Sequence, residues 1–174
     1  MSEPIKIIIG DSTILYAFAE AGRMDLLLSF SKEVSIAIPD YVEFELTQLI
    51  GGPESDRIAK FIKANPDRVS VMDTDYGKMF KHVYLVWQCS VDDSQFSEIM
   101  IKEGLSMPEK PIYSLADSTT MLTRHFIENP PENHVYLVVN DSYFIDDETS
   151  FYYKNFTLMS HGILIDWLKS NNTV

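Results

Sequence analysis

The sequence predicts an α/β fold, arranged as a three-layer α/β/α sandwich with a mainly parallel central sheet. Short apolar runs rich in β-branched residues alternate with longer segments of helical periodicity, and parallel strands need crossovers of this kind between them. The two clearest runs are Ile5–Ile9 and Val135–Val139. Three consecutive isoleucines in the first run suit a strand buried on both faces. We expect these two strands to lie side by side.

The remaining elements follow in order along the chain. Gly10 lets the chain turn into a helix expected at 12–20, and a strand at 34–38 ends at Pro39, after which Asp40 is placed to cap the next helix. Further helices are expected at 23–30, 41–50, 54–63, 113–127 and 162–169, further strands at 68–72 and 155–159, and a mostly helical segment at 75–105. We interpret residues 1–174 as a single domain with a helical insertion around 73–111.

Length and composition restrict the class of protein. A chain of 174 residues supports one full hydrophobic core. No apolar run approaches the roughly 20 residues of a membrane span, and the first residues lack the basic start of a secretory signal. The single cysteine, Cys89, cannot form an intramolecular disulfide and is expected to be a buried thiol. We therefore predict a cytoplasmic protein with no membrane partner.

The charge balance argues against a general nucleic-acid binder. The net charge is −12 and the isoelectric point about 4.6, whereas affinity for phosphates comes from lysine and arginine. An enzyme that holds nucleic acid through metal ions is still compatible with this composition. An acidic balance also arises when several carboxylates converge on one cation site.

Acidic residues occur on four elements, where strands end or where neighbouring helices begin. Asp11 and Asp141 follow the two clearest strands, Asp117 lies near the start of a helix, and the helix after Pro39 carries both Glu43 and Glu45. The two glutamates point about 200° apart around a helix, so only one can face a shared site. Gathered together, such carboxylates favour a hard divalent cation. Individually, each could instead be a helix cap, a first-turn acid or a turn residue.

The order and spacing of these acids resemble a known family. The stretches that carry the resemblance are residues 8–15, 38–46, 115–118 and 138–144. They are similar, in order, to the opening strand with its Asp, the strand–Pro–helix element with Val-x-x-Glu-Leu, the third acidic element and the Asn-Asp strand end of the PIN-domain metal-dependent ribonucleases. The tail at 156–160, leading into a helix, also fits this pattern.

The resemblance implies a function and a site. It implies an Mg²⁺- or Mn²⁺-dependent endoribonuclease that hydrolyses RNA phosphodiesters by metal-activated water, as in the toxins of toxin–antitoxin pairs. The implied metal ligands and catalytic residues are Asp11, Glu45, Asp117 and Asp141, with the Val-x-x-Glu-Leu match selecting Glu45 over Glu43. Ser12 and Asn140 are the implied supporting or phosphate-contacting groups.

A second interpretation stays open. The acidic balance and the long segment between Val71 and Tyr113 favour a catalytically inactive PIN-like module that binds a protein. An antitoxin, another regulatory protein or a second copy of the chain is the protein partner that these interpretations allow. The four histidines, His82, His125, His134 and His161, show no mutual ligand spacing, so we expect them to be surface or core residues.

Overall fold

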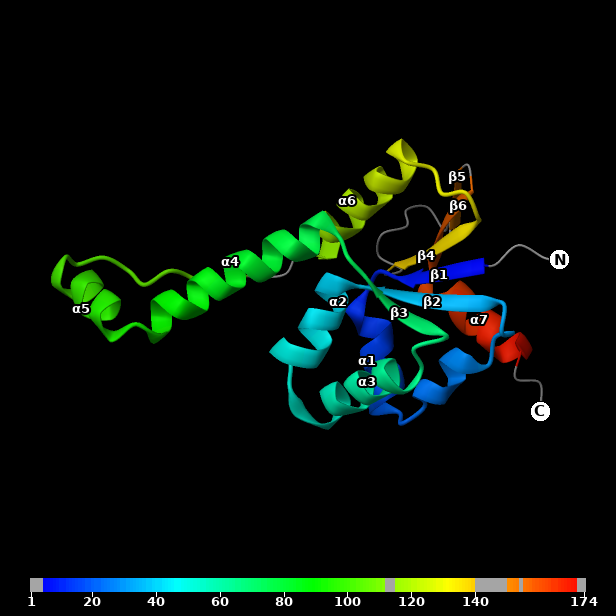
Figure 1. Ribbon diagram of the computed structural model, residues 1–174, viewed down its shortest axis with the longest axis horizontal. Coiled ribbons are helices and arrows are strands. Elements are labelled where there is room, and N and C mark those ends of the chain that lie inside the picture. The colour runs from blue at the N-terminus through cyan, green and yellow to red at the C-terminus, as the bar shows by residue number, and fades with distance from the viewer. Residues whose placement is uncertain (1–4, 112–114, 140–149, 154, 172–174) are drawn as a thin grey trace.

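A single six-stranded sheet with helices on both faces forms the body of the protein (Figure 1). This computed structural model describes residues 5–111, 115–139, 150–153 and 155–171. The strand order is β3-β2-β1-β4-β6-β5, and every neighbouring pair is parallel except β5 with β6. The strands are β1 Ile5–Ile9, β2 Val34–Pro39, β3 Val69–Met72, β4 Val135–Val139, β5 Ser150–Tyr153 and β6 Phe156–Ser160. The predicted fold class is confirmed.

The two central strands are the pair expected from the sequence. Ile8 of β1 lies opposite Leu137 of β4, and Ile7 lies opposite Ile36 of β2 on the other side. Ile7, Ile8 and Ile9 are at most 1% exposed, which shows that both faces of β1 are covered. Because β1 and β4 run parallel, their carboxyl ends meet at one edge of the sheet, where ligands bind in folds of this type.

The two faces carry different numbers of helices. On one face, Ile7 and Ile9 pack in a core with the helices α1 Ser12–Glu20, α3 Gly52–Ala64 and α7 His161–Asn171 and with the 3₁₀ turn η1 Met24–Leu28. On the other face, Ile8 packs in a smaller core with Leu122 and Phe126 of α6 Leu115–Glu128. The result is an α/β/α sandwich with one thick and one thin helical layer.

The helix after Pro39 changes character midway. Its first part, α2 Asp40–Phe44, is α-helical, and its second part, η2 Glu45–Leu49, is a π-helical turn in which Ile50 N–H donates to the Glu45 carbonyl (3.1 Å). Such turns are rare, and they occur frequently at functional sites. The buried Ser55 hydroxyl, from α3, donates to the Leu46 carbonyl inside the turn. This contact supports the backbone that presents Glu45.

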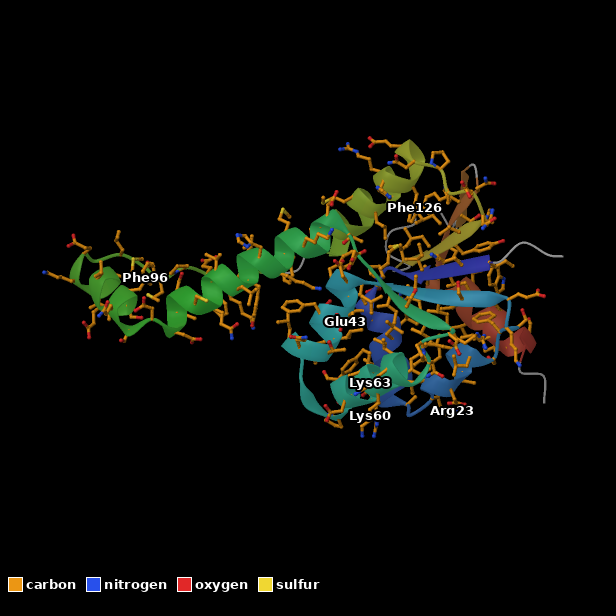
Figure 2. The ribbon with its side chains drawn as sticks, in the orientation of Figure 1. Arg23, Glu43, Lys60, Lys63, Phe96 and Phe126 are labelled. Atoms are coloured by element: carbon orange, nitrogen blue, oxygen red, sulfur yellow. The ribbon has the colours of Figure 1, made fainter. Side chains whose placement is uncertain are left out.

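The predicted insertion forms an arm that projects from the body (Figure 1). It consists of α4 Asp75–Asp92, α5 Ser94–Lys102 and the returning segment 103–111. The first turns of α4 are buried at Tyr76 and Phe80, whereas Phe96 marks the far end, well away from the body (Figure 2). Trp87 donates from Nε1 to the carbonyl of Pro108 (3.0 Å), which ties the returning segment to α4.

Apolar side chains remain open to solvent on the arm. Seven of the twelve exposed large apolar side chains among the described residues lie there: Met79, Val83, Leu85, Val86, Ile99, Ile101 and Leu105. Cys89 is exposed on α4, so the expectation of a buried thiol is wrong. Met79, Val83 and Val86 have the spacing of a core-facing stripe on a helix, but all three are exposed.

One strand at the edge of the sheet was not expected from the sequence. Strand β5 pairs antiparallel with β6, with Ser150 opposite Met159. No helix in the part of the chain that the structure describes combines the length and the apolarity of a membrane span.

Candidate active site

Asp11 lies at the carboxyl edge of β1 and is fully buried. The preceding glycine lets β4 come close, because a Cβ on Gly10 would lie 3.2 Å from the carbonyl oxygen of Val138. One carboxylate oxygen of Asp11, Oδ1, accepts a hydrogen bond from the backbone N–H of Thr13 (3.0 Å) and thereby caps α1. The cap interpretation is therefore correct for this oxygen, and Oδ2 is left for other contacts.

Oδ2 of Asp11 faces a histidine from the opposite end of the chain. Nε2 of His161 lies 3.1 Å from this oxygen, and its side chain is only 15% exposed. His161 reaches the same edge because β6 runs parallel to β4 with Ser160 opposite Val139, and α7 starts with the next residue. From the sequence, His161 was expected to be only a surface or core residue. Its position directly after a parallel strand could have indicated that it lies at this edge of the sheet.

Glu45 is the second acid beside Asp11. It is the first residue of the π-helical turn and is partly buried. The Ser12 hydroxyl lies within hydrogen-bonding reach of its carboxylate, and the negative charge of Asp11 is close enough to oppose its ionisation. Among the described residues, its Oε2 atom has no hydrogen-bond partner.

The surroundings shift the pKa values of the two carboxyl groups, Asp11 and Glu45, in opposite directions. Burial would raise the pKa of Asp11, but contacts with His161 and with the Thr13 N–H outweigh it and hold that pKa below its ordinary value. Burial also raises the pKa of Glu45; the Ser12 contact opposes this, and the Asp11 charge adds to it. Two neighbouring acids with separated pKa values are typical of functional sites.

The raised pKa of Glu45 gives a prediction for stability. The folded chain keeps a proton on Glu45 at pH values where the unfolded chain has lost it, so the free energy of unfolding falls as pH rises through that range. We expect Glu45→Gln to unfold at a higher temperature than wild type at pH 7 in metal-free buffer. The advantage should shrink toward pH 4, close to the ordinary pKa of glutamate, about 4.3.

Thermal unfolding followed by circular dichroism between pH 4 and pH 8 checks this. Glu43→Gln is the matched control, because Glu43 lies on the same helix. An advantage of Glu45→Gln that did not depend on pH would mean that packing, rather than ionisation, separates the two proteins.

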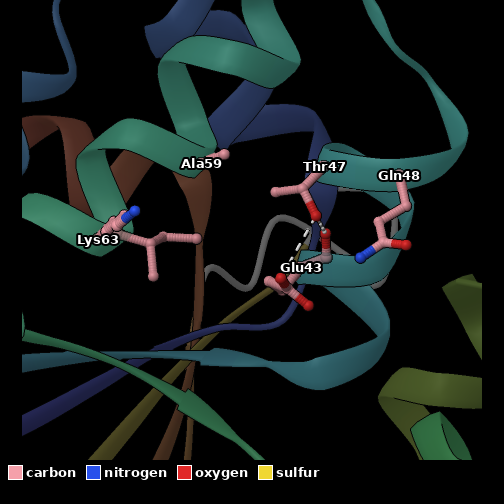
Figure 3. A pocket seen from close by; sticks show the side chains of 6 residues that line it. Glu43, Thr47, Gln48, Ala59 and Lys63 are labelled. Carbon is pink, nitrogen blue, oxygen red and sulfur yellow. Dashed lines mark hydrogen bonds between the residues drawn. The ribbon is translucent and has the colours of Figure 1, made fainter.

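The structure separates Glu43 from this pair. Glu43 lies in a groove between α2 and α3, across from Lys63 (Figure 3). The Thr47 hydroxyl donates to the Glu43 carbonyl (2.7 Å) and to its Oε1 atom (3.3 Å). Of the two glutamates, Glu45 is the one beside Asp11.

The other expected site residues are described only in part or not at all. Asp117 belongs to the first turns of α6, in the portion of that helix whose side chains are not described. Asp141 and Asn140 follow β4 and lie outside the described residues. Within the residues that the structure describes, no group of three or more His, Cys, Asp or Glu side chains could by itself hold a metal ion. Of the site residues expected from the sequence, the structure therefore brings together three: Asp11, Ser12 and Glu45.

A cavity of about 290 Å³ opens at the same edge of the sheet, past the ends of β2 and β3. Aromatic side chains line it from α2, α4 and α6, including Tyr76, His125 and Phe126. Its polar lining comes from the β3–α4 connection. Aromatic walls of this kind suit planar groups such as nucleobases.

Comparison with protein-family models, with curated proteins and with solved structures found no match.

Proposed function

We propose that this protein is a divalent-metal-dependent endoribonuclease of PIN-like type. The observation that carries the proposal is the pairing of a fully buried carboxylate, Asp11, with the partly buried Glu45 at the carboxyl edge of the central strand. Two carboxylates that disfavour each other's charge are stabilised together by a cation. The same edge is where α/β proteins bind their ligands.

The residues fit a hard divalent ion. Oε2 of Glu45 is a buried oxygen without a hydrogen-bond partner among the described residues, and the buried Oδ2 of Asp11 is ion-paired with His161. Mg²⁺ and Mn²⁺ take carboxylate oxygens. Asp117 and Asp141 are the proposed additional ligands. A bound ion would act as a Lewis acid on the phosphate and lower the pKa of water.

The chain's own groups have separate tasks in this proposal. The lowered pKa of Asp11 keeps its carboxylate charged, so it anchors the ion. The Ser12 hydroxyl orients the carboxylate of Glu45, and Asn140 is proposed to contact phosphate. The aromatic cavity beyond the ends of β2 and β3 is the proposed place for a base of the RNA.

A second candidate function is a catalytically inactive PIN-like module that binds a protein. The arm favours it, because seven exposed large apolar side chains on one projecting element are typical of an interaction surface. A nuclease toxin that is held by an antitoxin would combine RNA cleavage with protein binding, and a second copy of the chain is an alternative partner. For either function we propose a location in the cytoplasm.

The test is cleavage of a labelled single-stranded RNA by the pure protein with Mg²⁺ or Mn²⁺, with EDTA as the blank. We expect cleavage by wild type and by Glu43→Gln, and a loss of about a hundredfold or more in Glu45→Gln, since even groups that only support a metal ligand are worth 10–100-fold. An equal loss of cleavage in Glu43→Gln and Glu45→Gln would refute the assignment of Glu45, rather than Glu43, to the site. No cleavage by wild type with either ion would leave the binding module as the function.

A further inference from the structure

We infer that the arm is the dimerisation element of this protein, with α4 of one copy packed antiparallel against α4 of a second copy. The inference does not depend on the proposed cleavage of RNA. It goes beyond the second candidate function because it names the partner of the arm and the orientation in which the two copies bind.

One side of α4 offers an apolar surface to a partner. Met79, Leu85 and Val86 are 53–54% exposed, and helical spacing places them within about 120° of arc. A hollow of about 420 Å³ opens on the same side, and Cys89 and Phe96 at the start of α5 also line it. Apolar side chains of a second helix can pack into such a hollow.

The apolar area on the arm is large enough for a stable interface. Its seven exposed large apolar side chains are between 46% and 77% exposed. At roughly 100 Å² for each, they offer about 700 Å², close to the roughly 800 Å² that each partner buries in a standard interface. In a symmetric dimer the same surface of both copies is covered.

The charges of the arm are complementary to themselves in the antiparallel orientation. The first two turns of α4 carry Lys78 and Lys81 beside a single acid, Asp75, and residues 82–91 contain no Lys, Arg, Asp or Glu. Four acids and one lysine follow at the far end: Asp92, Asp93, Glu98, Glu103 and Lys102. Antiparallel pairing therefore places the acidic end of each arm beside the lysines of the other.

One pair of these charges defines the register. Lys78 and Asp92 are both exposed, and within the described residues no ion pair joins either to another side chain. About 21 Å of helix separates them in one copy, so they cannot meet there. A twofold axis at Leu85, midway between them, brings Lys78 of one copy level with Asp92 of the other.

The charge of the body argues against a parallel pair. Residues 75–111 hold six of the 26 acids and four of the 14 lysines and arginines, so the rest of the chain has a net charge of −10. The body lies at one end of the arm (Figure 1), and parallel arms would bring two such bodies together. Antiparallel arms keep them at opposite ends of the pair, where salt screens their repulsion.

Analytical ultracentrifugation of the 174-residue chain, in reducing buffer so that Cys89 cannot cross-link two copies, tests the inference. We expect wild type to dimerise with a dissociation constant of about 10 μM or below. Val86→Glu should weaken the dimer at least about tenfold, because it buries two charges close to the twofold axis. The control Ile127→Glu changes an apolar side chain of similar exposure, 48%, on α6, and should leave dimerisation unchanged.

A charge exchange tests the orientation. Lys78→Glu and Asp92→Lys should each weaken the dimer about threefold or more, because each change places like charges opposite one another at two symmetric positions. The double variant restores opposite charges across the interface and should regain the wild-type affinity. Circular dichroism verifies the fold of each variant, and the changed side chains at positions 78, 86 and 92 are all exposed.

Three results would count against the inference. Wild type that stays monomeric at about 100 μM would overturn it, and the arm would then bind a different protein. A dimer that Val86→Glu does not weaken would also overturn it, because the copies would meet on another surface. Weakening by both single charge variants without recovery in the double variant would rule out the antiparallel orientation. These results are independent of the cleavage test, so failure of one proposal does not imply failure of the other.

Discussion

Replacing Asp11 with asparagine is expected to reduce the proposed metal-dependent RNA cleavage by more than about a hundredfold. The variant removes the charge of a proposed metal ligand, and even groups behind a metal ligand are worth 10–100-fold. The asparagine side-chain oxygen can still accept the hydrogen bond from Thr13 N–H that caps α1. The fold should therefore survive, and the loss should be confined to metal binding and cleavage.

The matched control for this experiment is Asp25→Asn. Asp25 is an exposed aspartate at the surface, paired with Arg23 at 3.0 Å. Cleavage rates and Mn²⁺ affinities of the two variants are compared with wild type, and circular dichroism verifies folding. Cleavage by Asp11→Asn at the wild-type rate would contradict both the role of Asp11 and the nuclease proposal.

Replacing Gly77 with alanine is expected to lower the free energy of unfolding by about 3–5 kcal/mol, since overpacking costs about 1–3 kcal/mol and each lost hydrogen bond to a charged group about 1.5–3 kcal/mol. A Cβ at position 77 would lie 1.9 Å from Oδ1 of Asp40. Asp40 is buried and already accepts from Thr74 N–H (3.1 Å), the Thr74 hydroxyl (2.7 Å) and Tyr41 N–H (2.9 Å). It cannot move without breaking these bonds.

Urea denaturation measures this loss. The control Gly162→Ala places a Cβ 3.6 Å from the Ser160 hydroxyl, an ordinary contact in a helix, and should be neutral or stabilise by up to about 1 kcal/mol. The two tryptophans lie in different parts of the molecule, Trp87 on the arm and Trp167 on α7. Variants that keep only one of them therefore report on the unfolding of each part by fluorescence. A similar loss in both glycine variants would mean that the Asp40 contact is not what limits position 77.

The layers of this fold could be predicted because they depend on local patterns. Three isoleucines in a row need cover on both faces, and the alternation of such runs with helices leaves few arrangements besides a parallel sheet. The antiparallel edge strand Ser150–Tyr153 was missed because its pairing with β6 is a long-range choice. The π-helical turn at Glu45 was missed because one hydrogen bond shifted by a residue barely changes the apolar spacing.

The sequence indicated which residue types lie at the candidate site, but it did not show which contact each atom makes. Asp11 was weighed as either a cap or a site residue, yet its Oδ1 caps α1 while its Oδ2 faces His161. A carboxylate has two oxygens, and sequence patterns cannot divide them. His161 was missed because it meets Asp11 only through the packing of the last helix against the sheet.

Cys89 and the apolar stripes of α4 show a different limit. Helical spacing predicts which residues share a face, but it does not say whether anything covers that face. On α4 the buried residues lie in the first turns, and the ring of Tyr84 still contacts Phe44 of α2. The helix expected within 75–105 is therefore present, whereas the expectation of a buried thiol at Cys89 is wrong.

The way α4 is held also decides how the molecule comes apart. Eighteen residues of helix span about 27 Å, but the buried contacts of this helix, at Tyr76 and Phe80, are concentrated in its first turns. Beyond these turns the helix is held by the returning segment, through Trp87 and Pro108, rather than by the sheet. Within a single copy, we therefore expect the far end to open and close without disturbing the sheet, as a separate cooperative unit of low stability. Amide protection should therefore fall steeply along one continuous helix, from core-like values near Phe80 to almost none near Val91.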